Sequence, residues 1–300
     1  MKILFDRRHF STFLCEALCV IALAHLSACS NFGAMQSSVT KSTTLGKDRI
    51  AEFVGSADRS AADRNNDLRR KPEQMLDFIG IRPGMTALDL STGGGYTAEL
   101  LARAIGPAGA VYGQSQPARL ANVALRSAVA PEGNSSPQLK TVEQAPSATP
   151  AVRRTSAQAL AQRAATALLS NLHAIVRVFE DPVPSELMAR LDLVTLMFNY
   201  HDLGHMGVDR QQMNAAVFAG LKPGGLYIIA DHAGRAGTGI SESGTLHRIE
   251  EAFLREEVEA AGFKLAGSAD FLRNPSDPRD KNTPEPAQPK DEFVLKFVKP

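Results

Sequence analysis

The sequence contains no tryptophan, only three cysteines and no surplus of charge of either sign. Of its 300 residues, 33 are basic and 32 are acidic, which gives a net charge of +1 at neutral pH. Such a chain lacks the basic surplus of a nucleic-acid-binding protein, so we expect no nucleic-acid partner. No apolar run reaches the roughly 20 residues that a membrane-spanning helix needs.

The amino terminus is typical of an export signal. A short basic start precedes an apolar stretch at residues 17–26, which suits the apolar core of a signal peptide. The stretch ends in Leu26-Ser27-Ala28-Cys29, which resembles the bacterial lipobox. A signal peptidase cuts that motif before its cysteine, whose thiol then carries a diacylglycerol. We predict a lipoprotein signal peptide over residues 1–28; the alternative is a buried helix that happens to end in cysteine.

Lipidation at Cys29 would account for the few cysteines. Cys15 and Cys19 would leave with the signal, so the mature chain would hold no free thiol and no disulfide. That composition fits an oxidising compartment and excludes a cysteine nucleophile or a cysteine-based zinc site. Ser30 suits sorting to the outer membrane. We therefore expect a protein anchored by lipid to the membrane on the periplasmic face of the envelope, with residues 29–46 as a flexible tether.

The remaining residues, 47–300, predict one α/β domain. An apolar strand at 85–90, a glycine loop at 91–95, a helix at 96–105 and a strand from 110 form a βαβ unit with parallel strands. Further buried strands and amphipathic helices follow, and residues 127–160, rich in alanine, proline and serine, predict an insertion or surface loop. Strands are expected at 174–179, 191–198, 226–230, 264–269 and 292–298, with helices at 156–171, 209–220 and 246–261.

The glycine loop is the first candidate binding element. Gly93, Gly94 and Gly95 lack a Cβ, so a ligand can approach the backbone closely, and the following helix N-terminus favours an anionic group. Taken alone, the loop also fits the weakly specific Gly-x-Gly-x-x-Ala pattern of dinucleotide-binding proteins. It could also be a tight turn that serves packing and has no role in binding. In an open α/β sheet, ligands bind beyond the carboxyl ends of the strands, so the residues that follow each strand matter most.

The run Leu88-Asp89-Leu90-Ser91-Thr92-Gly93-Gly94-Gly95 resembles motif I of the class I S-adenosylmethionine (SAM) methyltransferases. The likeness continues through residues 191–194, the Leu-Lys-Pro-Gly-Gly turn at 221–225 and the Ala-Gly-Phe at 261–263. It implies a Rossmann-like, doubly wound, mainly parallel seven-stranded sheet with a C-terminal antiparallel hairpin. Further motifs resemble a group of predicted exported bacterial methyltransferases: residues 69–72, 199–202, 231–233 and 246–248.

Two positions depart from the family pattern. Ser91 stands where motif I has its first glycine, and Gln114 stands where an acid usually ends the second strand and holds the ribose hydroxyls. A glutamine can still hydrogen-bond a diol, although it does so without charge. The missing acid also counts against an NAD site, which requires a carboxylate at about that position.

For this chain the resemblance implies SAM as cofactor. Asp89 and the loop would hold the amino-acid part of SAM, and Glu180 or Asp181 would meet the adenine edge. The full predicted cofactor set is Asp89, Ser91, Gly93, Gly95, Tyr96, Gln114, Asp181 and Asn199. Methyl transfer from a sulfonium needs positioning above all, and a base helps if the acceptor is protonated. The candidate catalytic residues are His201, Asp202 and His232.

Several of these residues also have plainer interpretations. His201 and His205 are spaced as metal ligands on a helix, but Gly204 and the preceding strand favour a loop, so no metal is expected. Asp89 could merely cap its loop, and Asp231 with His232 could merely end a strand. Arg69 to Lys71 are either a solvated charge run or a clamp for a substrate carboxylate or phosphate. His247 and Arg248 fall in a predicted helix, where exposure is the default.

The function favoured by the sequence is a SAM-dependent methyltransferase acting on a small molecule or an envelope component. One alternative is an exported ligand-binding protein that keeps the fold with a lapsed SAM site, for which Ser91 and Gln114 would be the signs. Another is an NAD(P)-dependent oxidoreductase.

Overall fold

The computed structural model describes residues 43–118 and 154–300. The predicted signal peptide, Cys29 and most of the tether lie outside the described residues, as does most of the predicted insertion. Within the described residues, no helix is both long and apolar enough to cross a membrane.

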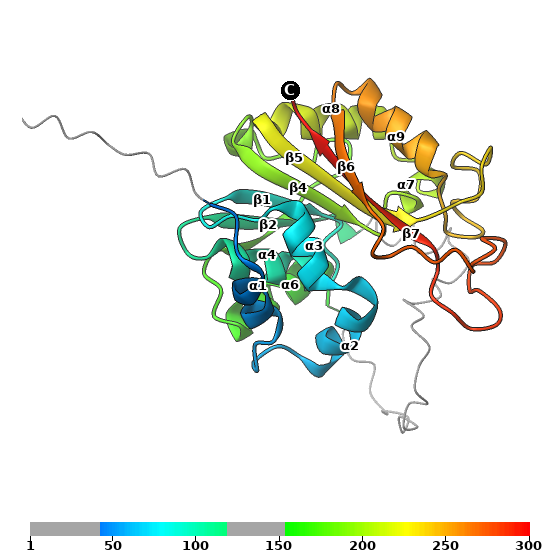
Figure 1. The fold of residues 1–300 in the computed structure, drawn as a ribbon. Helices are drawn as coiled ribbons and strands as arrows, with labels where there is room; N and C mark the ends of the chain where they lie inside the picture. Colours follow the sequence, from blue (N-terminus) through cyan, green and yellow to red (C-terminus); the bar gives the residue numbers. More distant parts are fainter. Residues whose placement is uncertain (1–42, 119–153) are drawn as a thin grey trace, which may run out of the picture. The chain divides into compact units, whose positions relative to one another are not determined.

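The domain is built on one seven-stranded sheet with the strand order β3-β2-β1-β4-β5-β7-β6 (Figure 1). Strands β1 to β5 pair in parallel, and β7 pairs antiparallel with both β5 and β6, which confirms the predicted fold class. The strands are β1 (Thr86–Leu90), β2 (Ala110–Ser115), β3 (Leu172–Val176), β4 (Leu191–Met197), β5 (Leu221–His232), β6 (Lys264–Ala269) and β7 (Glu292–Val298).

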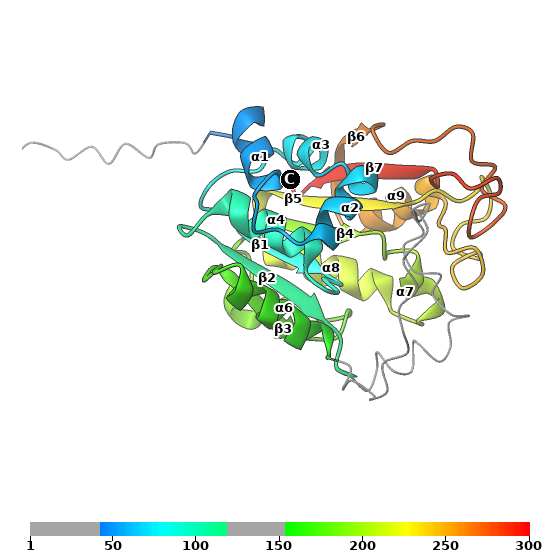
Figure 2. The ribbon, with the colours of Figure 1, turned by 90° about the horizontal axis from the view of Figure 1, so that it is seen from below.

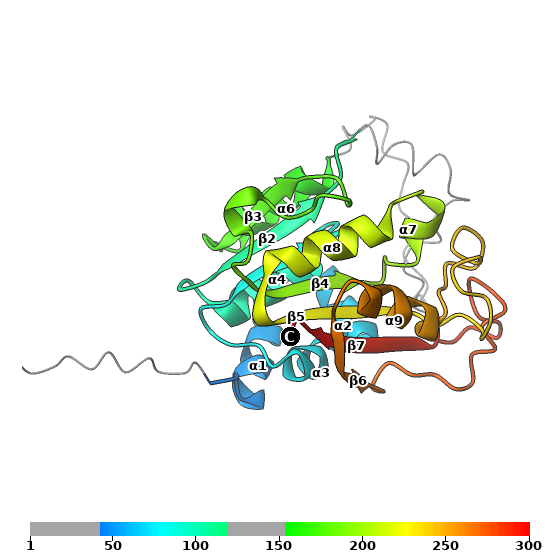
Figure 3. The same ribbon diagram turned by 90° about the horizontal axis from the view of Figure 1, so that it is seen from above.

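Helices cover both faces of the sheet, because alternate residues of the central strands are apolar on both sides. Leu88 and Val194 point into a core with α8 and α9, whereas Ala87 and Leu193 point into a second core with α1, α3 and α4. Figures 2 and 3 view the molecule from opposite sides and show these layers. The helices are α1 (Lys47–Val54), α2 (Ala61–Arg70), α3 (Pro72–Ile79), α4 (Tyr96–Ile105), α6 (Ser156–Thr166), α7 (Asp202–His205), α8 (Arg210–Gly220) and α9 (Glu251–Ala260), with a 3₁₀ turn η1 (Ser185–Leu187).

Several predicted boundaries were wrong, including the strand expected at 174–179, which is β3 at Leu172–Val176, and the end of the helix expected at 156–171, which is α6 at Ser156–Thr166. The predicted insertion, 127–160, overlaps the helix expected from residue 156; α6 does begin at Ser156, behind a capping box made by Thr155 and Gln158, so residues 156–160 belong to the helix. The Leu-Lys-Pro-Gly-Gly turn is the irregular start of β5 rather than a separate turn. The helix expected from residue 246 begins only at Glu251, since the backbone of His247 has a φ of 50° and leaves the right-handed helical region.

Leu160 of α6 ties this helix to the glycine loop. A methyl group added at Gly95 or at Gly113 would lie 2.4 or 2.3 Å from the methyl carbons of Leu160, so both positions accept only glycine at this packing distance. The Leu160 side chain is completely buried. Leu160 therefore packs directly against the glycine loop and holds α6 against β2.

Replacing Leu160 by alanine should remove this support. The variant Leu160→Ala is expected to lower the free energy of unfolding by about 2–5 kcal/mol, because it leaves a cavity between α6 and the loop. Leu168→Ala makes the same change at a side chain that is 89% exposed and should alter stability by less than about 0.5 kcal/mol. Urea unfolding measures both values, and equal losses in the two variants would contradict this account of the packing.

Candidate functional site

The carboxyl ends of β1, β4 and β5 form one edge of the sheet, because these three strands are parallel neighbours. Asp89 pairs in register with Thr195, and Met197 pairs with Ala230. The segments that follow these strands therefore meet at one place. They are the glycine loop after β1, residues 198–205 after β4, and the end of β5 at Asp231 and His232.

The glycine loop has a left-handed backbone at three of its residues. Ser91, Gly93 and Gly95 have φ angles of 52°, 53° and 86°. Ser91 adopts this conformation without the freedom of glycine, and its N–H donates to Oε1 of Gln114 at 2.9 Å. A Cβ at Gly94 would meet no atom of the described residues within 4 Å. At Gly94, therefore, no atom of the described residues blocks the close approach of a ligand from the Cβ side.

Gln114 braces the loop through both ends of its carboxamide. Its side chain is fully buried, accepts from the Ser91 N–H and donates from Nε2 to the carbonyl of Arg177 at 2.6 Å. The sequence predicted Gln114 as a partner of the ribose hydroxyls. In the structure both ends of its carboxamide join the loop to the segment after β3, so it supports the loop from behind.

Asp89 lies beneath the loop and is almost fully buried, with 2% of the residue exposed. Its Oδ1 accepts a hydrogen bond from Oγ1 of Thr195 at 2.6 Å. Burial raises the pKa of Asp89 to about 6, against the opposing effect of this hydrogen bond. At neutral pH the loop consequently lies above a buried negative charge.

Arg70, at the end of α2, is a candidate that the sequence did not single out from its charge run. Its guanidinium lies 4.5 Å from the ring centre of Phe198 and 5.4 Å from that of Tyr96. Its Nε is buried and has no hydrogen-bond partner in the described part of the chain. Burial lowers the pKa of Arg70 to about 10, as does neighbouring Arg69, so it stays charged at neutral pH. A buried donor without a partner marks a place for an acceptor from a ligand.

Three other predicted cofactor residues have partners within the protein. The hydroxyl of Tyr96 donates to Asp67 at 2.6 Å, which fixes the ring as a wall beside Arg70. Asp181 is exposed and pairs with Arg177, so it lies at the surface. Asn199 donates from Nδ2 to Oδ2 of Asp202 at 2.7 Å and belongs to the histidine cluster described next.

The predicted catalytic residue His201 lies in a cluster of charged and imidazole groups. Its Nδ1 is 2.6 Å from Oδ1 of Asp231, and its Nε2 is 3.1 Å from Oδ1 of Asp202. Burial alone would lower the pKa of His201, but the carboxylates of Asp231 and Asp202 outweigh it and raise the pKa to about 9. For Asp202 the signs are reversed: burial alone would raise the pKa of this carboxyl, but hydrogen bonds from His201 and His247 hold its pKa well below the usual range. In this arrangement His201 is a cation rather than a ready base.

His232, the third predicted catalytic residue, differs from His201 in charge. Burial and the nearby Lys290 ammonium lower its pKa well below the ordinary value, so its imidazole is neutral. Its Nδ1 lies 3.0 Å from Oε1 of Glu292, without the alignment of a hydrogen bond. The ring lies between Phe198 and His201, with centroids 5.7 and 5.2 Å away. It therefore connects the glycine-loop half of the site to the histidine half.

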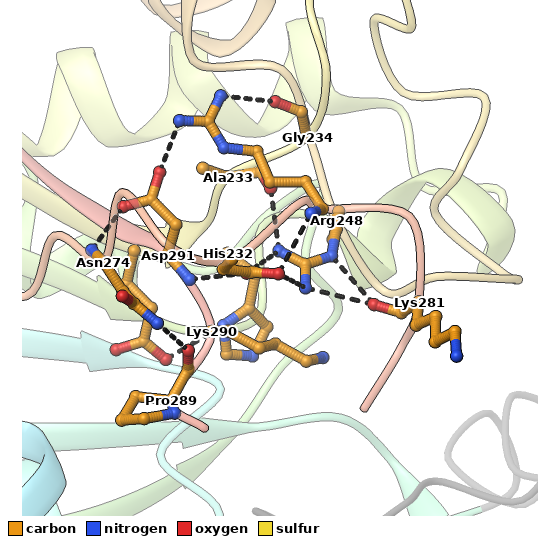
Figure 4. A network of polar contacts seen from close by, with 12 residues as sticks. His232, Ala233, Gly234, Arg248, Asn274, Lys281, Pro289, Lys290 and Asp291 are labelled. Atoms are coloured by element: carbon orange, nitrogen blue, oxygen red, sulfur yellow. Dashed lines mark hydrogen bonds and ion pairs between the residues drawn. The ribbon is translucent and has the colours of Figure 1, made fainter. Parts of the chain in front are cut away.

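His247 is the residue that the sequence placed wrongly. Its Nδ1 lies 2.9 Å from Oδ1 of Asp202, and its side chain is 12% exposed, in a loop rather than on a helix surface. The next residue, Arg248, is fully buried, with ion-pair contact to Asp277 at 2.9 Å. Arg248 also donates to the carbonyls of Ala233 and Lys281, each at 3.0 Å (Figure 4). This network anchors the loop that delivers His247.

Loss of the Arg248 anchor should destabilise the protein strongly. Arg248→Ala is expected to lower the free energy of unfolding by about 3–5 kcal/mol, because it leaves the Asp277 carboxylate buried and unpaired. Arg255→Ala removes a half-exposed arginine that pairs with Glu259 on α9, and should cost less than about 1 kcal/mol. Chemical denaturation compares the two variants, and a small loss for Arg248→Ala would show that the network does not carry the loop.

Comparison with known proteins supports the fold. No family model matches the chain, and no curated protein is similar to it in sequence. Among solved structures, a SAM-dependent methyltransferase from Aquifex aeolicus has 16% identity and a TM-score of 0.52, with 85% of this chain and 100% of that chain covered. A proposed sarcosine dimethylglycine methyltransferase from Galdieria sulphuraria has 13% identity and a TM-score of 0.51, with 84% and 98% covered. At these identities the likeness establishes a shared fold: this chain has the α/β fold of class I methyltransferases.

Proposed function

We propose that the chain is a SAM-dependent methyltransferase. The observation that carries the proposal is the left-handed loop at Ser91, Gly93 and Gly95 between β1 and α4. Beside it lies the Nε of Arg70, which has no hydrogen-bond partner among the described residues. The two methyltransferase structures of the same fold support it. The loop lies at the carboxyl ends of the parallel strands, which is where open α/β sheets bind their ligands.

The residues around the loop fit the charges of SAM. When bound, SAM supplies a methyl group on a positively charged sulfonium. The guanidinium of Arg70 can pair with the carboxylate of its amino-acid part through charge-assisted hydrogen bonds. The buried carboxylate of Asp89 favours a cationic ligand above the loop. The open backbone at Gly94 leaves room for close approach. These groups come from α2, β1 and the loop, so they converge from three directions.

The acceptor would enter on the histidine side of the site. His201, Asp202 and His232 line that side after β4 and at the end of β5. Of these, neutral His232 suits the role of a base better than protonated His201, whose proton is held between two carboxylates. The rings of Phe198 and His232 would separate acceptor and cofactor halves and align the two reactants. The acceptor class that we propose is a small molecule or an envelope component.

We further propose that the protein is exported and anchored by lipid to the periplasmic face of the envelope. The apolar stretch at residues 17–26 and the lipobox ending at Cys29 support this location. The absence of any other cysteine from the mature chain is compatible with an oxidising compartment.

Calorimetric titration of SAM into the purified full chain tests the proposed activity. We expect one binding site, and Arg70→Met should weaken the affinity about 10- to 100-fold because a charge-assisted contact to the carboxylate is lost. Arg64→Met changes an exposed arginine on the same helix, so its affinity should match the parent protein. Circular dichroism confirms that both variants are folded.

The titration separates the functions that share this fold. Binding of SAM that depends on Arg70 supports the methyltransferase. A folded chain that binds neither SAM nor its demethylated product would overturn the proposal and favour a binding protein with a lapsed site. Tight binding of NAD(P) instead would favour an oxidoreductase.

Labelling with radioactive palmitate tests the proposed anchor. Expressed in a bacterial host, the chain should incorporate label, and Cys29→Ala should abolish it because no thiol remains at the cut site. Cys15→Ala, in the signal segment, should keep the label and serves as the matched control. Label that persists in Cys29→Ala would refute lipidation at this residue.

A further inference from the structure

Four of the seven histidines gather beside the end of β4, and three of them lie within 4 Å of the carboxylate of Asp202. His201, His205, His232 and His247 lie within ring distances of 5.2 to 5.6 Å along the cluster. We propose that His201, Asp202 and His247 form a binding site for a divalent transition-metal ion of the Zn²⁺ class. The site is carried by this cluster alone and holds whether or not the chain transfers methyl groups.

The donor atoms have the spacing of a coordination shell. Ligand atoms of these three residues all lie within 4.8 Å of one another. Oδ1 of Asp202 is 3.1 Å from Nε2 of His201 and 2.9 Å from Nδ1 of His247. Metal–ligand bonds of about 2.0–2.2 Å place neighbouring donors roughly 3 Å apart, which is the spacing of Asp202 from each histidine, so an ion can take the place of the shared protons.

Two of the three ligands, His201 and Asp202, are held in orientation by residues behind them. Asp231 accepts from the backbone N–H of His201 and contacts its Nδ1, which turns Nε2 toward Asp202. Asn199 donates to Oδ2 of Asp202, which leaves Oδ1 for the centre of the cluster. A carboxylate behind a histidine and a hydrogen bond behind a ligating carboxylate are the usual supports of protein metal sites.

His247, the third ligand, has a strained backbone conformation. His247 has a φ of 50°, a conformation that residues other than glycine rarely adopt, and the buried Arg248 network fixes the loop on its carboxyl side. A side chain held in this way by over-determined surroundings is a feature of functional sites. Packing alone does not require a histidine here, because the ring points to Asp202 and not into either core.

Burial increases from the opening to the back of the site. The side chains of Asp202, His247 and His201 are 22%, 12% and 3% exposed. Three protein ligands, with the outermost reachable from solvent, leave a fourth position for water or for a donor atom of a substrate, as in catalytic zinc sites. Two imidazoles and one carboxylate favour Zn²⁺, Co²⁺ or Fe²⁺ over Mg²⁺ and Ca²⁺, which prefer oxygen ligands alone.

Titration with Co²⁺ tests the site, because bound Co²⁺ can be followed by its visible absorption. The full chain is purified without a histidine tag, with serine at its three cysteine positions to remove thiolate ligands. After treatment with a chelator, we expect saturation at one equivalent of Co²⁺. Zn²⁺ should then displace Co²⁺, whereas excess Mg²⁺ or Ca²⁺ should not.

Single substitutions then assign the ligands. His247→Ala and Asp202→Asn should each weaken Co²⁺ binding by at least about 100-fold, since each removes a direct ligand. His173→Ala replaces an exposed histidine of β3 and should bind as the parent does. The midpoint of denaturant unfolding shows whether each variant is folded. If His247→Ala does not fold, His247→Gln provides a milder change at the same position.

Two outcomes would overturn the proposal. One is the absence of saturable Co²⁺ and Zn²⁺ binding by the folded chain, which would leave the cluster as a network of hydrogen bonds around Asp202. The other is binding that survives in both His247→Gln and Asp202→Asn, which would place the ion elsewhere. Neither result bears on SAM binding, which is measured in the absence of metal, so the two proposals fail separately.

Discussion

A buried carboxylate at the end of β5 organises this site. Asp231 is fully buried and accepts hydrogen bonds from the backbone N–H groups of His201 and His232, while its Oδ1 also contacts the His201 ring. An isolated charge at this depth would be very costly, so these partners are a condition of its presence. These hydrogen bonds to Asp231 also fix where the chain turns after β4 and which way the His201 ring faces.

Around this carboxylate the sheet edge divides into two halves of opposite character. On one side, the glycine loop offers open backbone above Asp89 and beside the guanidinium of Arg70. On the other, Asp202 is surrounded by imidazoles. The rings of Phe198 and His232 stand between the halves. Such an arrangement suits a reaction in which a bound donor and an acceptor are aligned across an aromatic boundary and kept from water.

The sheet and the loop could be predicted from the sequence because their signals are local. The run at 191–198 is apolar on both faces, and the glycines at 93–95 follow a strand directly. The bracing role of Gln114 could not be predicted, because its partners, the Ser91 N–H and the Arg177 carbonyl, come from distant segments. Asn199, predicted as a cofactor residue, donates to Asp202 only three residues along the chain, but this contact depends on how the segment after β4 turns, which no residue pattern shows.

The same limit applies to Arg70 and His247. Arg70 was one of three consecutive basic residues, and only tertiary packing buries its Nε between two rings. His247 lies in a stretch whose apolar residues have helical spacing, so the sequence predicts that α9 begins at residue 246. The buried ion pair between Arg248 and Asp277 instead holds this segment as a loop. Long-range contacts override the periodicity there, as they commonly do at functional sites.

A crystal structure of the full chain with the demethylated product of SAM, S-adenosylhomocysteine, would test the central claim most directly. The account predicts that the carboxylate of the ligand contacts Arg70, that its amino-acid part lies over the loop above Asp89, and that its sulfur faces His232 and His201. Electron density for the ligand at any other place, with the Nε of Arg70 still without a partner, would contradict it.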